Sequence, residues 1–262
     1  MEKNPNPKRF NSPPPHLFAH RGGNAAGKSR ENTLAAFQSA ANLGYKFLET
    51  DVIATKDGQA VTYHGSANFF MKAIFRLELR RKVQSLTYDQ LKRAITLGGE
   101  TIPTLEEALV KLNRQAFCID VKTNEAIEPM VRAINKHNAK NRVVITSFSR
   151  KRSIQANRLL YGENFNGACL CVYRLKGWSI SLFPALWLNR LKRQGFGYVH
   201  IPYKCVTRRL LNEAKKRDFK IYAWTVNKQE DIERLLSWGV GGIISDEAEI
   251  LIKFQKSFDK KY

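Results

Sequence analysis

Residues 17–54 read LFAHRGGNAAGKSRENTLAAFQSAANLGYKFLETDVIA, and this stretch sets the pattern that the rest of the chain repeats. Leu17–His20 and Tyr45–Ala54 are short apolar runs, which are typical of buried strands. Between them, Thr33–Leu43 carries apolar residues at the spacing of a helix that packs on one face. A strand, a helix and a second strand in this order predict a parallel sheet covered by helices.

Signals at the ends of these elements support the assignment. Asn32 is a candidate N-cap for the helix, and Gly44 is a candidate stop, because glycine readily adopts the left-handed conformation that ends many helices. After the second strand, Asp57-Gly58 predicts a tight turn into Ala60–His64. We expect this segment to return along the second strand as a hairpin.

The same alternation continues to the C-terminus. Further strands are predicted at Ala116–Lys122, Arg142–Ser147, Gly167–Tyr173, Gly197–Pro202, Lys220–Val226 and Gly242–Ser245. Helical patterns are predicted at Glu125–His137, Arg150–Leu160, Arg208–Arg217, Gln229–Trp238 and Glu247–Phe258. About eight such units in roughly 245 residues predict an α/β fold, a (β/α)8 TIM barrel with a small insertion after the second strand. A doubly wound sheet is the alternative.

Two segments, residues 65–100 and 174–195, interrupt the alternation with connections longer than usual. Within them, Phe69–Lys82 and Arg174–Arg193 combine basic residues with aromatic and aliphatic ones, a pattern typical of helices at a membrane surface. The alternative is that the apolar residues pack on the barrel while the cations are solvated. The residues that carry the pattern are Phe70, Lys72, Ile74, Arg76, Leu77 and Arg80, then Trp178, Leu182, Phe183, Leu186, Trp187 and Leu188.

The charge of the chain indicates anionic partners. Its 262 residues include 44 Lys and Arg against 23 Asp and Glu, a net charge of +21, while 43% hydrophobic residues supply a core and exclude wholesale disorder. Such an excess favours a phosphate-bearing substrate, an anionic membrane surface or nucleic acid. The aromatic residues cluster with aliphatic ones instead of forming a spaced stacking platform, so we expect no specific nucleic-acid partner.

The domain organisation is simple. Residues 1–15 hold five of the nine prolines and predict a disordered tail, and residues 16–262 predict one domain. The tail has no apolar run of the kind found in signal peptides, and no stretch of about 18 apolar residues predicts a membrane-spanning helix. Cysteines in apolar runs favour reduced thiols, so we expect a cytoplasmic protein with possible contact at the inner face of the membrane. The cysteines are Cys118, Cys169, Cys171 and Cys205.

Acidic side chains follow the predicted strands. Glu49 and Asp51 are two residues apart, so both face the same side of an extended strand, where like charges are costly without a cation. Asp120 is a third oxygen donor, on a different strand. Oxygen ligands of this kind suit Mg²⁺ or Ca²⁺. The alternative is that Arg21 and Lys122 neutralise the carboxylates without a metal.

Two histidines at strand ends, His20 and His64, could act as general acid and general base. Arg21 and Lys122 would then stabilise the charge of a phosphoryl group, and Trp224 could form a wall of the site. A single histidine at a strand end is more often a satisfied polar group, and a tryptophan is more often part of the core. Together, these residue types predict phosphodiester cleavage. The remaining histidines are interpreted as structural or surface residues: His16, His137 and His200.

Several motifs occur in an order that is known from one family. They are His20–Gly23, Glu31–Thr33 with Phe37 and Ala40, Gly44, Glu49–Val52, Thr55–Gly58, Val61, His64, Ile102–Glu107, Asp120–Lys122, Ser147–Phe148, Trp224–Asn227 and Gly242–Asp246. From about residue 17 to 250 the chain resembles the glycerophosphodiester phosphodiesterase family. The resemblance implies a TIM barrel that uses a divalent cation to hydrolyse glycerophosphodiesters to glycerol 3-phosphate and an alcohol.

The resemblance also implies roles for individual residues. By position, it makes His20 and His64 the catalytic acid–base pair and Glu49, Asp51 and Asp120 the metal ligands. Arg21 and Lys122 become phosphate contacts, with Glu31 beside them as an orienting or substrate-side carboxylate. In some family members the second histidine lies next to the metal instead.

Three departures from the family pattern bear on the substrate, and one is that the arginine–threonine motif usual downstream of the second histidine is absent. Gly65 follows His64 where the family usually has an aspartate, and Asp120 stands where a glutamate is common. Both features resemble the related phospholipase D toxins of spider venom, which act on lysolipids and sphingolipids. We therefore keep a lysophospholipase D-like enzyme on membrane lysolipids, and a non-catalytic phospholipid-binding barrel, as alternatives. A cyclic phosphate product is possible in either enzymatic case.

Overall fold

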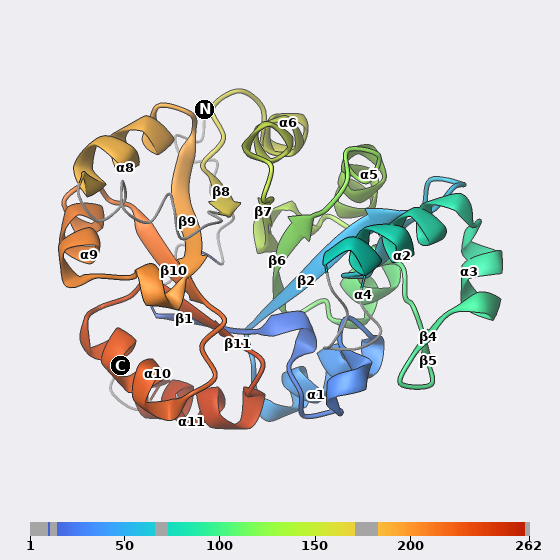
Figure 1. Ribbon diagram of the computed structural model, residues 1–262, viewed down its shortest axis with the longest axis horizontal. Coiled ribbons are helices and arrows are strands. Elements are labelled where there is room, and N and C mark those ends of the chain that lie inside the picture. The colour runs from blue at the N-terminus through green and yellow to red at the C-terminus, as the bar shows by residue number, and fades with distance from the viewer. Residues whose placement is uncertain (1–9, 11–14, 66–72, 171–182, 260–262) are drawn as a thin grey trace.

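The computed structural model describes residue 10 and residues 15–65, 73–170 and 183–259. Parallel strands form a ring that is surrounded by helices, as Figure 1 shows. The ring consists of β1 (His16–Ala19), β2 (Phe47–Ala54), β6 (Ala116–Val121), β7 (Val143–Thr146), β8 (Gly167–Leu170), β9 (Phe196–Pro202), β10 (Lys220–Trp224) and β11 (Gly242–Ser245). Strand pairing runs β7-β6-β2-β1-β11-β10-β9-β8, and β7 and β8 lie side by side. This nearly closed barrel confirms the predicted fold and excludes the doubly wound sheet.

The helices of the outer layer follow the strands in turn. They are α1 (Leu34–Leu43), α4 (Leu105–Lys111), α5 (Ile127–Lys136), α6 (Arg150–Tyr161), α8 (Pro184–Lys192), α9 (Arg208–Lys215), α10 (Gln229–Ser237) and α11 (Ala248–Asp259). The predicted bounds of strands and helices agree with the observed ones to within two residues. The one exception is the predicted strand Gly167–Tyr173, whose last residues lie outside the described part of the chain.

The start of α1 corrects one prediction. Thr33, not Asn32, is the N-cap: its backbone is extended, and its hydroxyl accepts a hydrogen bond from the amide of Ala36 at 3.2 Å. Asn32 is in the left-handed region with φ 60°, which an N-cap does not adopt. The predicted stop is confirmed, because Gly44 ends the helix with φ 106°.

The predicted hairpin and insertion are both present. β3 (Ala60–Thr62) pairs antiparallel with β2 after the Asp57-Gly58 turn. The insertion holds α2 (Ala73–Ser85), α3 (Tyr88–Ala94) and a small hairpin of β4 (Thr96–Leu97) and β5 (Glu100–Thr101). Of the two basic apolar segments, residues 69–72 and 174–182 lie outside the described residues.

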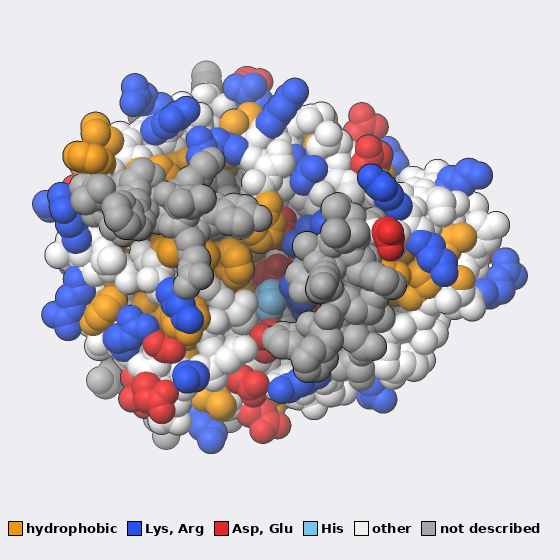
Figure 2. All heavy atoms as spheres, in the orientation of Figure 1, with side chains coloured by type: hydrophobic (Ala, Val, Ile, Leu, Met, Phe, Trp, Pro, Cys, Tyr) orange, Lys and Arg blue, Asp and Glu red, His pale blue; other side chains and the backbone are white. Residues whose placement is uncertain are grey.

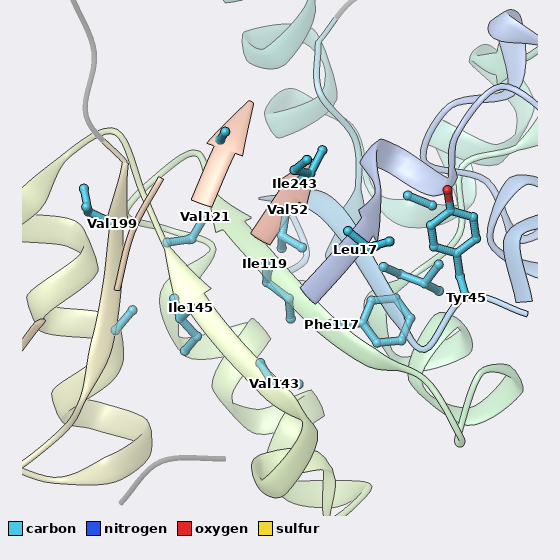
Figure 3. Packing of buried hydrophobic residues seen from close by; sticks show 14 of the residues in the cluster. Leu17, Tyr45, Val52, Phe117, Ile119, Val121, Val143, Ile145, Val199 and Ile243 are labelled. Atoms are coloured by element: carbon cyan, nitrogen blue, oxygen red, sulfur yellow. The ribbon is translucent and has the colours of Figure 1, made fainter. Parts of the chain in front are cut away.

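Side chains of the strands form two apolar layers. One layer lies inside the barrel, because all eight ring strands contribute to it, with Phe18, Tyr198 and Tyr222 as its largest members. The other faces the helices and includes Phe117 and Ile119, which Figure 3 shows on β6. Alternation along each strand therefore fills the lower barrel and leaves its upper end for polar groups.

The N-terminal segment reaches the barrel earlier than expected. Phe10, which we placed in the tail, is fully buried against Phe18 and Phe47, and its carbonyl accepts a hydrogen bond from Lys220 Nζ at 2.8 Å. His16 is buried in β1, and its Nδ1 lies 2.6 Å from the hydroxyl of Tyr222. In the described residues, no helix has both the length and the apolar character needed to cross a membrane.

Candidate active site

The predicted site residues lie together at the carboxyl ends of the strands. β2 and β6 pair in parallel, so that Glu49 is opposite Cys118 and Asp51 is opposite Asp120. Glu49, Asp51 and Asp120 are all buried. Figure 2 shows acidic, basic and histidine side chains meeting in a hollow near the centre of this face. The barrel therefore places the carboxylates where TIM-barrel enzymes carry their chemistry.

Two cations neutralise these carboxylates. Arg21 donates from Nη1 to Glu31 Oε2 at 2.8 Å, and its Nε lies 3.0 Å from Asp51 Oδ2. Lys122 Nζ lies 2.5 Å from Asp51 Oδ1 and also contacts Asp120. Burial alone would raise the pKa of Asp51, but Lys122 and Arg21 hold it well below its usual range. The ion pairs that we expected if Arg21 and Lys122 neutralise the carboxylates without a metal are therefore present.

His20 is held between two carboxylates. It begins a short 3₁₀ turn, His20–Gly22, directly after β1, and its Nδ1 lies 2.5 Å from Asp246 Oδ1, directly after β11. Its Nε2 lies 3.7 Å from Glu49 Oε2. Asp246 is fixed in turn by Asn227, whose amide donates at 2.9 Å. Burial and Arg21 lower the pKa of His20, but Glu49 and Asp246 outweigh them and raise it above its ordinary value.

His64 lies on the other side of the carboxylates, just after β3, and is 8% exposed. Burial lowers its pKa to about 2, and the positive charges of Arg21, Lys122 and Arg80 add to this effect while Asp51 opposes it. Its imidazole is therefore neutral near pH 7. The guanidinium of Arg80, from α2, donates from Nε to the backbone carbonyl of His64 at 2.8 Å.

The carboxylates can be tested for their fit to a divalent cation. Burial raises the pKa of Glu49 to about 7 and that of Asp120 to about 6, which shows that the present cations do not fully compensate these two groups. Oδ1 of Asp120 is buried without a hydrogen-bond partner. Among the described residues, no three His, Cys, Asp or Glu side chains are grouped closely enough to hold a metal as they stand. The donor chemistry fits a hard cation, and the metal site stays a prediction.

Asn32 is a site residue that the sequence did not identify in this role. Its side-chain amide donates to Asp51 Oδ2 at 3.1 Å, and its side-chain oxygen accepts from the hydroxyl of Thr50 at 2.8 Å and from the amide of Asp51 at 3.2 Å. It is fully buried. Asn32 thus has a left-handed backbone in place of the helix cap, and its side chain bonds to β2.

Two aromatic side chains flank the cations. Phe148 follows β7 and meets Trp224 edge to face, with 5.8 Å between the ring centroids. Lys122 Nζ lies over the Phe148 ring, 5.0 Å from its centroid. Phe148 is 42% exposed, whereas Trp224 packs partly on the barrel interior. The predicted wall residue Trp224 is therefore at the site, and Phe148 extends the wall to solvent.

Four residues at the site were given no role there by sequence reasoning. Asp246 contacts His20 across 226 residues, whereas Asn227, Asn32 and Arg80 contact Asp246, Asp51 and His64 from 16 to 19 residues away. A signal for Asp246 did exist, because it directly follows the last predicted strand, at the end of the barrel where chemistry is expected. Arg80 had no such signal, since its helix was interpreted as solvated or membrane-facing.

A parallel barrel with histidines, carboxylates and fixed cations at the carboxyl ends of its strands defines a class of TIM-barrel enzymes that act on anionic substrates. Comparison with known proteins narrows the class. The model of the glycerophosphoryl diester phosphodiesterase family matches residues 20–250. The chain therefore belongs to this family, and it is a phosphoric diester hydrolase. This excludes the non-catalytic barrel.

Relatives match along nearly the whole chain. A Mycobacterium tuberculosis protein named probable glycerophosphodiester phosphodiesterase 2 is 34% identical over 241 residues, which cover 89% of this chain and 88% of that protein. A Caldanaerobacter subterraneus glycerophosphodiester phosphodiesterase is 29% identical, with 90% and 96% covered. A human lysophospholipase D is 25% identical, with 92% and 86% covered.

Solved structures show the same fold. An Oleispira antarctica phosphodiesterase in complex with the product sn-glycerol-3-phosphate superimposes with a TM-score of 0.73 at 22% identity, covering 94% of this chain and 97% of that one. A Galdieria sulphuraria structure described as a putative glycerophosphodiester phosphodiesterase gives a TM-score of 0.76 at 20% identity, covering 94% and 99%. These two likenesses establish the barrel.

Proposed function

We propose that the protein hydrolyses glycerophosphodiesters to glycerol 3-phosphate and an alcohol, with His20 and His64 as the acid–base pair. The observation that carries the proposal is the 2.5 Å contact of His20 with Asp246, which fixes the ring while its other nitrogen is directed toward Glu49. The names of the relatives and the glycerol 3-phosphate in the Oleispira structure support the substrate class.

The two histidines divide the proton transfers. His20, whose protonated form is stabilised by Asp246 and Glu49, donates a proton to the oxygen of the departing alcohol. His64 accepts a proton from the attacking water or from a hydroxyl of the substrate. Its low pKa makes it a weak base in the substrate-free site, and the negative charge of a bound phosphodiester would raise this pKa by opposing Arg21, Lys122 and Arg80. If the substrate hydroxyl attacks, a cyclic phosphate forms before, or instead of, glycerol 3-phosphate. The same two residues serve either route.

Arg21 and Lys122 supply fixed positive charge to the phosphoryl oxygens, as Asp51 holds both cations at the site. Glu31 in turn holds the guanidinium of Arg21. A divalent cation, Mg²⁺ or Ca²⁺, bound by Glu49, Asp51 and Asp120 would add Lewis-acid stabilisation of the phosphoryl group.

Release of glycerol 3-phosphate from glycerophosphocholine by the purified protein tests the proposal. We expect His20→Ala and His64→Ala each to lower kcat by roughly a hundredfold or more, with unchanged circular dichroism spectra. His137→Ala is the matched control, because this histidine contacts Glu106 on the outer helices and should retain wild-type turnover. Failure of the wild type to release glycerol 3-phosphate would refute the substrate, and an active His20→Ala or His64→Ala protein would remove that residue from the mechanism.

A second candidate substrate, a membrane lysolipid, is favoured by two exposed apolar side chains. Phe183 and Leu186 are 59% and 67% exposed at the start of α8. Because α8 follows β8 and runs back along the barrel, its first turn lies at the end that holds the site. Lys204, Arg208 and Arg209 are exposed on the neighbouring connection and at the start of α9. We propose that this rim contacts the anionic inner face of a membrane.

Cosedimentation and turnover measured with vesicles distinguish the two candidate substrates. We expect the protein to cosediment with vesicles that contain phosphatidylserine, to dissociate at high salt, and to release choline from lysophosphatidylcholine in them. Phe183→Ser together with Leu186→Ser should weaken cosedimentation and the lysolipid reaction, and leave hydrolysis of glycerophosphocholine unchanged. Equal binding to neutral vesicles, or none to either kind, would contradict the membrane proposal without affecting the hydrolase.

A further inference from the structure

Arg80 links the insertion to the candidate active site. It lies on α2, sixteen residues after His64, and is half-buried although its neighbours Arg81 and Lys82 are exposed. The helix packs against β2, the strand that carries Glu49 and Asp51. The sequence pattern placed Arg80 among the basic residues of a membrane-facing or solvated helix, and the structure instead directs it to His64.

Arg80 contacts the backbone just beyond the end of the pairing between β2 and β3. The amide of Tyr63 still donates to the carbonyl of Asp51, at 3.0 Å, as a continuation of the β2–β3 pairing. At the next residue, Nε of Arg80 donates to the carbonyl of His64 at 2.8 Å. Gly65 then turns away with φ 101°. Arg80 therefore binds the backbone of His64 two residues beyond the end of β3.

The position of the charge is consistent with this contact. Among the groups on which the guanidinium of Arg80 acts electrostatically are His64 itself and Asp120, which lies across the site on β6. A guanidinium is suited to such a place, because it stays charged and offers several donors in a fixed plane. The charge and the hydrogen bond thus come from one side chain of the insertion.

We propose that Arg80 is a positioning residue: its hydrogen bond to the His64 carbonyl holds the backbone so that the imidazole stays aimed at the phosphoryl group. This rests on the proposed role of His64. The insertion then has a part in the reaction that is independent of membrane contact. Displacement of a catalytic group by about 1 Å is enough to cost a hundredfold in rate, so the loss of one such hydrogen bond should be measurable.

Steady-state hydrolysis of glycerophosphocholine by Arg80→Ala, Arg80→Lys and Arg81→Ala tests the proposal. Arg81→Ala is the matched control, because it removes the same charge from the next, exposed position. For Arg80→Ala we expect at least a tenfold fall in kcat with less than a threefold change in KM, and partial rescue by added guanidinium. Arg80→Lys should fall between the wild type and Arg80→Ala, and Arg81→Ala should stay within twofold of the wild type.

A mutant cycle with His64→Ala shows whether Arg80 acts through His64. We expect Arg80→Ala to cause no more than a twofold further loss of the residual turnover of His64→Ala. An unchanged kcat in Arg80→Ala, a change in KM alone, or a loss equal to that of Arg81→Ala would overturn the proposal. So would an undiminished loss in the His64→Ala background. A fully active His64→Ala protein would instead refute the proposed role of His64. This result comes from the single His64 variant, so it is distinguishable from a failure of the Arg80 proposal.

Discussion

Nδ1 of His20 lies 2.5 Å from Oδ1 of Asp246, although 226 residues separate the two in the chain. We predict that Asp246→Asn lowers kcat about tenfold to a hundredfold, because the amide can neither hold the ring in the same way nor stabilise its protonated form. Initial rates at saturating glycerophosphocholine measure the effect. Asp218→Asn, at an exposed position on the outside of the barrel, is the control and should have wild-type rates. Equal rates for both variants would show that the contact is dispensable.

Asn32 offers a test that separates backbone strain from hydrogen bonding. Asn32→Ala loses the three side-chain hydrogen bonds to β2 and places a β-carbon in a left-handed backbone, so we expect a loss of about 2–4 kcal/mol in the free energy of unfolding. Asn32→Gly should recover about 1 kcal/mol of this, because glycine tolerates φ 60°. Urea denaturation measures both values.

Asn138 provides the matched pair for this experiment, because it is exposed and also left-handed, with φ 50°. Asn138→Ala should show only the strain, and Asn138→Gly should be close to the wild type. If Asn32→Ala were no more destabilising than Asn138→Ala, the hydrogen bonds to Thr50 and Asp51 would carry no stability.

Removal of divalent cations should abolish turnover. We predict that EDTA stops the release of glycerol 3-phosphate, that Mg²⁺ or Ca²⁺ restores it, and that the metal raises the melting temperature of the substrate-free protein. A concentration a hundredfold above Kd adds about 2.7 kcal/mol to stability. Asp120→Asn should remove this thermal shift, while Asp89→Asn, an exposed carboxylate in the insertion, should retain it. Turnover in EDTA at the wild-type rate would refute the metal proposal.

The stability of the barrel should depend on pH through His200. Burial lowers the pKa of this interior histidine from its ordinary value of 6.5 to about 3. The unfolded chain therefore binds a proton at a pH where the folded protein does not. The free energy of unfolding is therefore not reduced by His200 above pH 6.5. Below this pH it falls by about 1.4 kcal/mol for each pH unit until the pH nears 3.

His200→Leu removes this dependence. Between pH 6.5 and pH 5, we expect the wild type to lose about 2 kcal/mol more of its unfolding free energy than the variant does. Urea denaturation at several pH values gives the two slopes, and the difference cancels the effects of other titrating groups that both proteins share. Parallel slopes would show that His200 is protonated in the folded barrel or does not titrate in this range.

Local sequence rules were sufficient to predict the strands of the barrel and the side of the strand on which its carboxylates lie. The spacing of Glu49 and Asp51 predicted that both face one side of the strand, and both contact Arg21 in the structure. The Asp57-Gly58 turn and the Gly44 stop were likewise encoded in a few neighbouring residues. Periodicity and turn chemistry act over short distances, so a single sequence reveals them.

Contacts that depend on the closed barrel were not accessible in this way. Asn32 satisfies the preferences of a helix cap, and only the position of β2 beside it explains why its side chain turns to Thr50 and Asp51. Arg80 has the periodicity of a solvated helix face, and its inward direction depends on where His64 lies in three dimensions. Phe10 lies in a proline-rich segment, and its packing partners Phe18 and Phe47 come together only when their strands pair in the barrel.

The pairing of β1 with β11 joins the first and last strands of the barrel at the candidate active site. Of the barrel strands, a ribosome makes β1 first and β11 last, so the growing chain presents His20 without Asp246 until β11 has been added. The site is therefore assembled by closure of the ring, and a nascent barrel that lacks its last strand also lacks the contact that fixes His20.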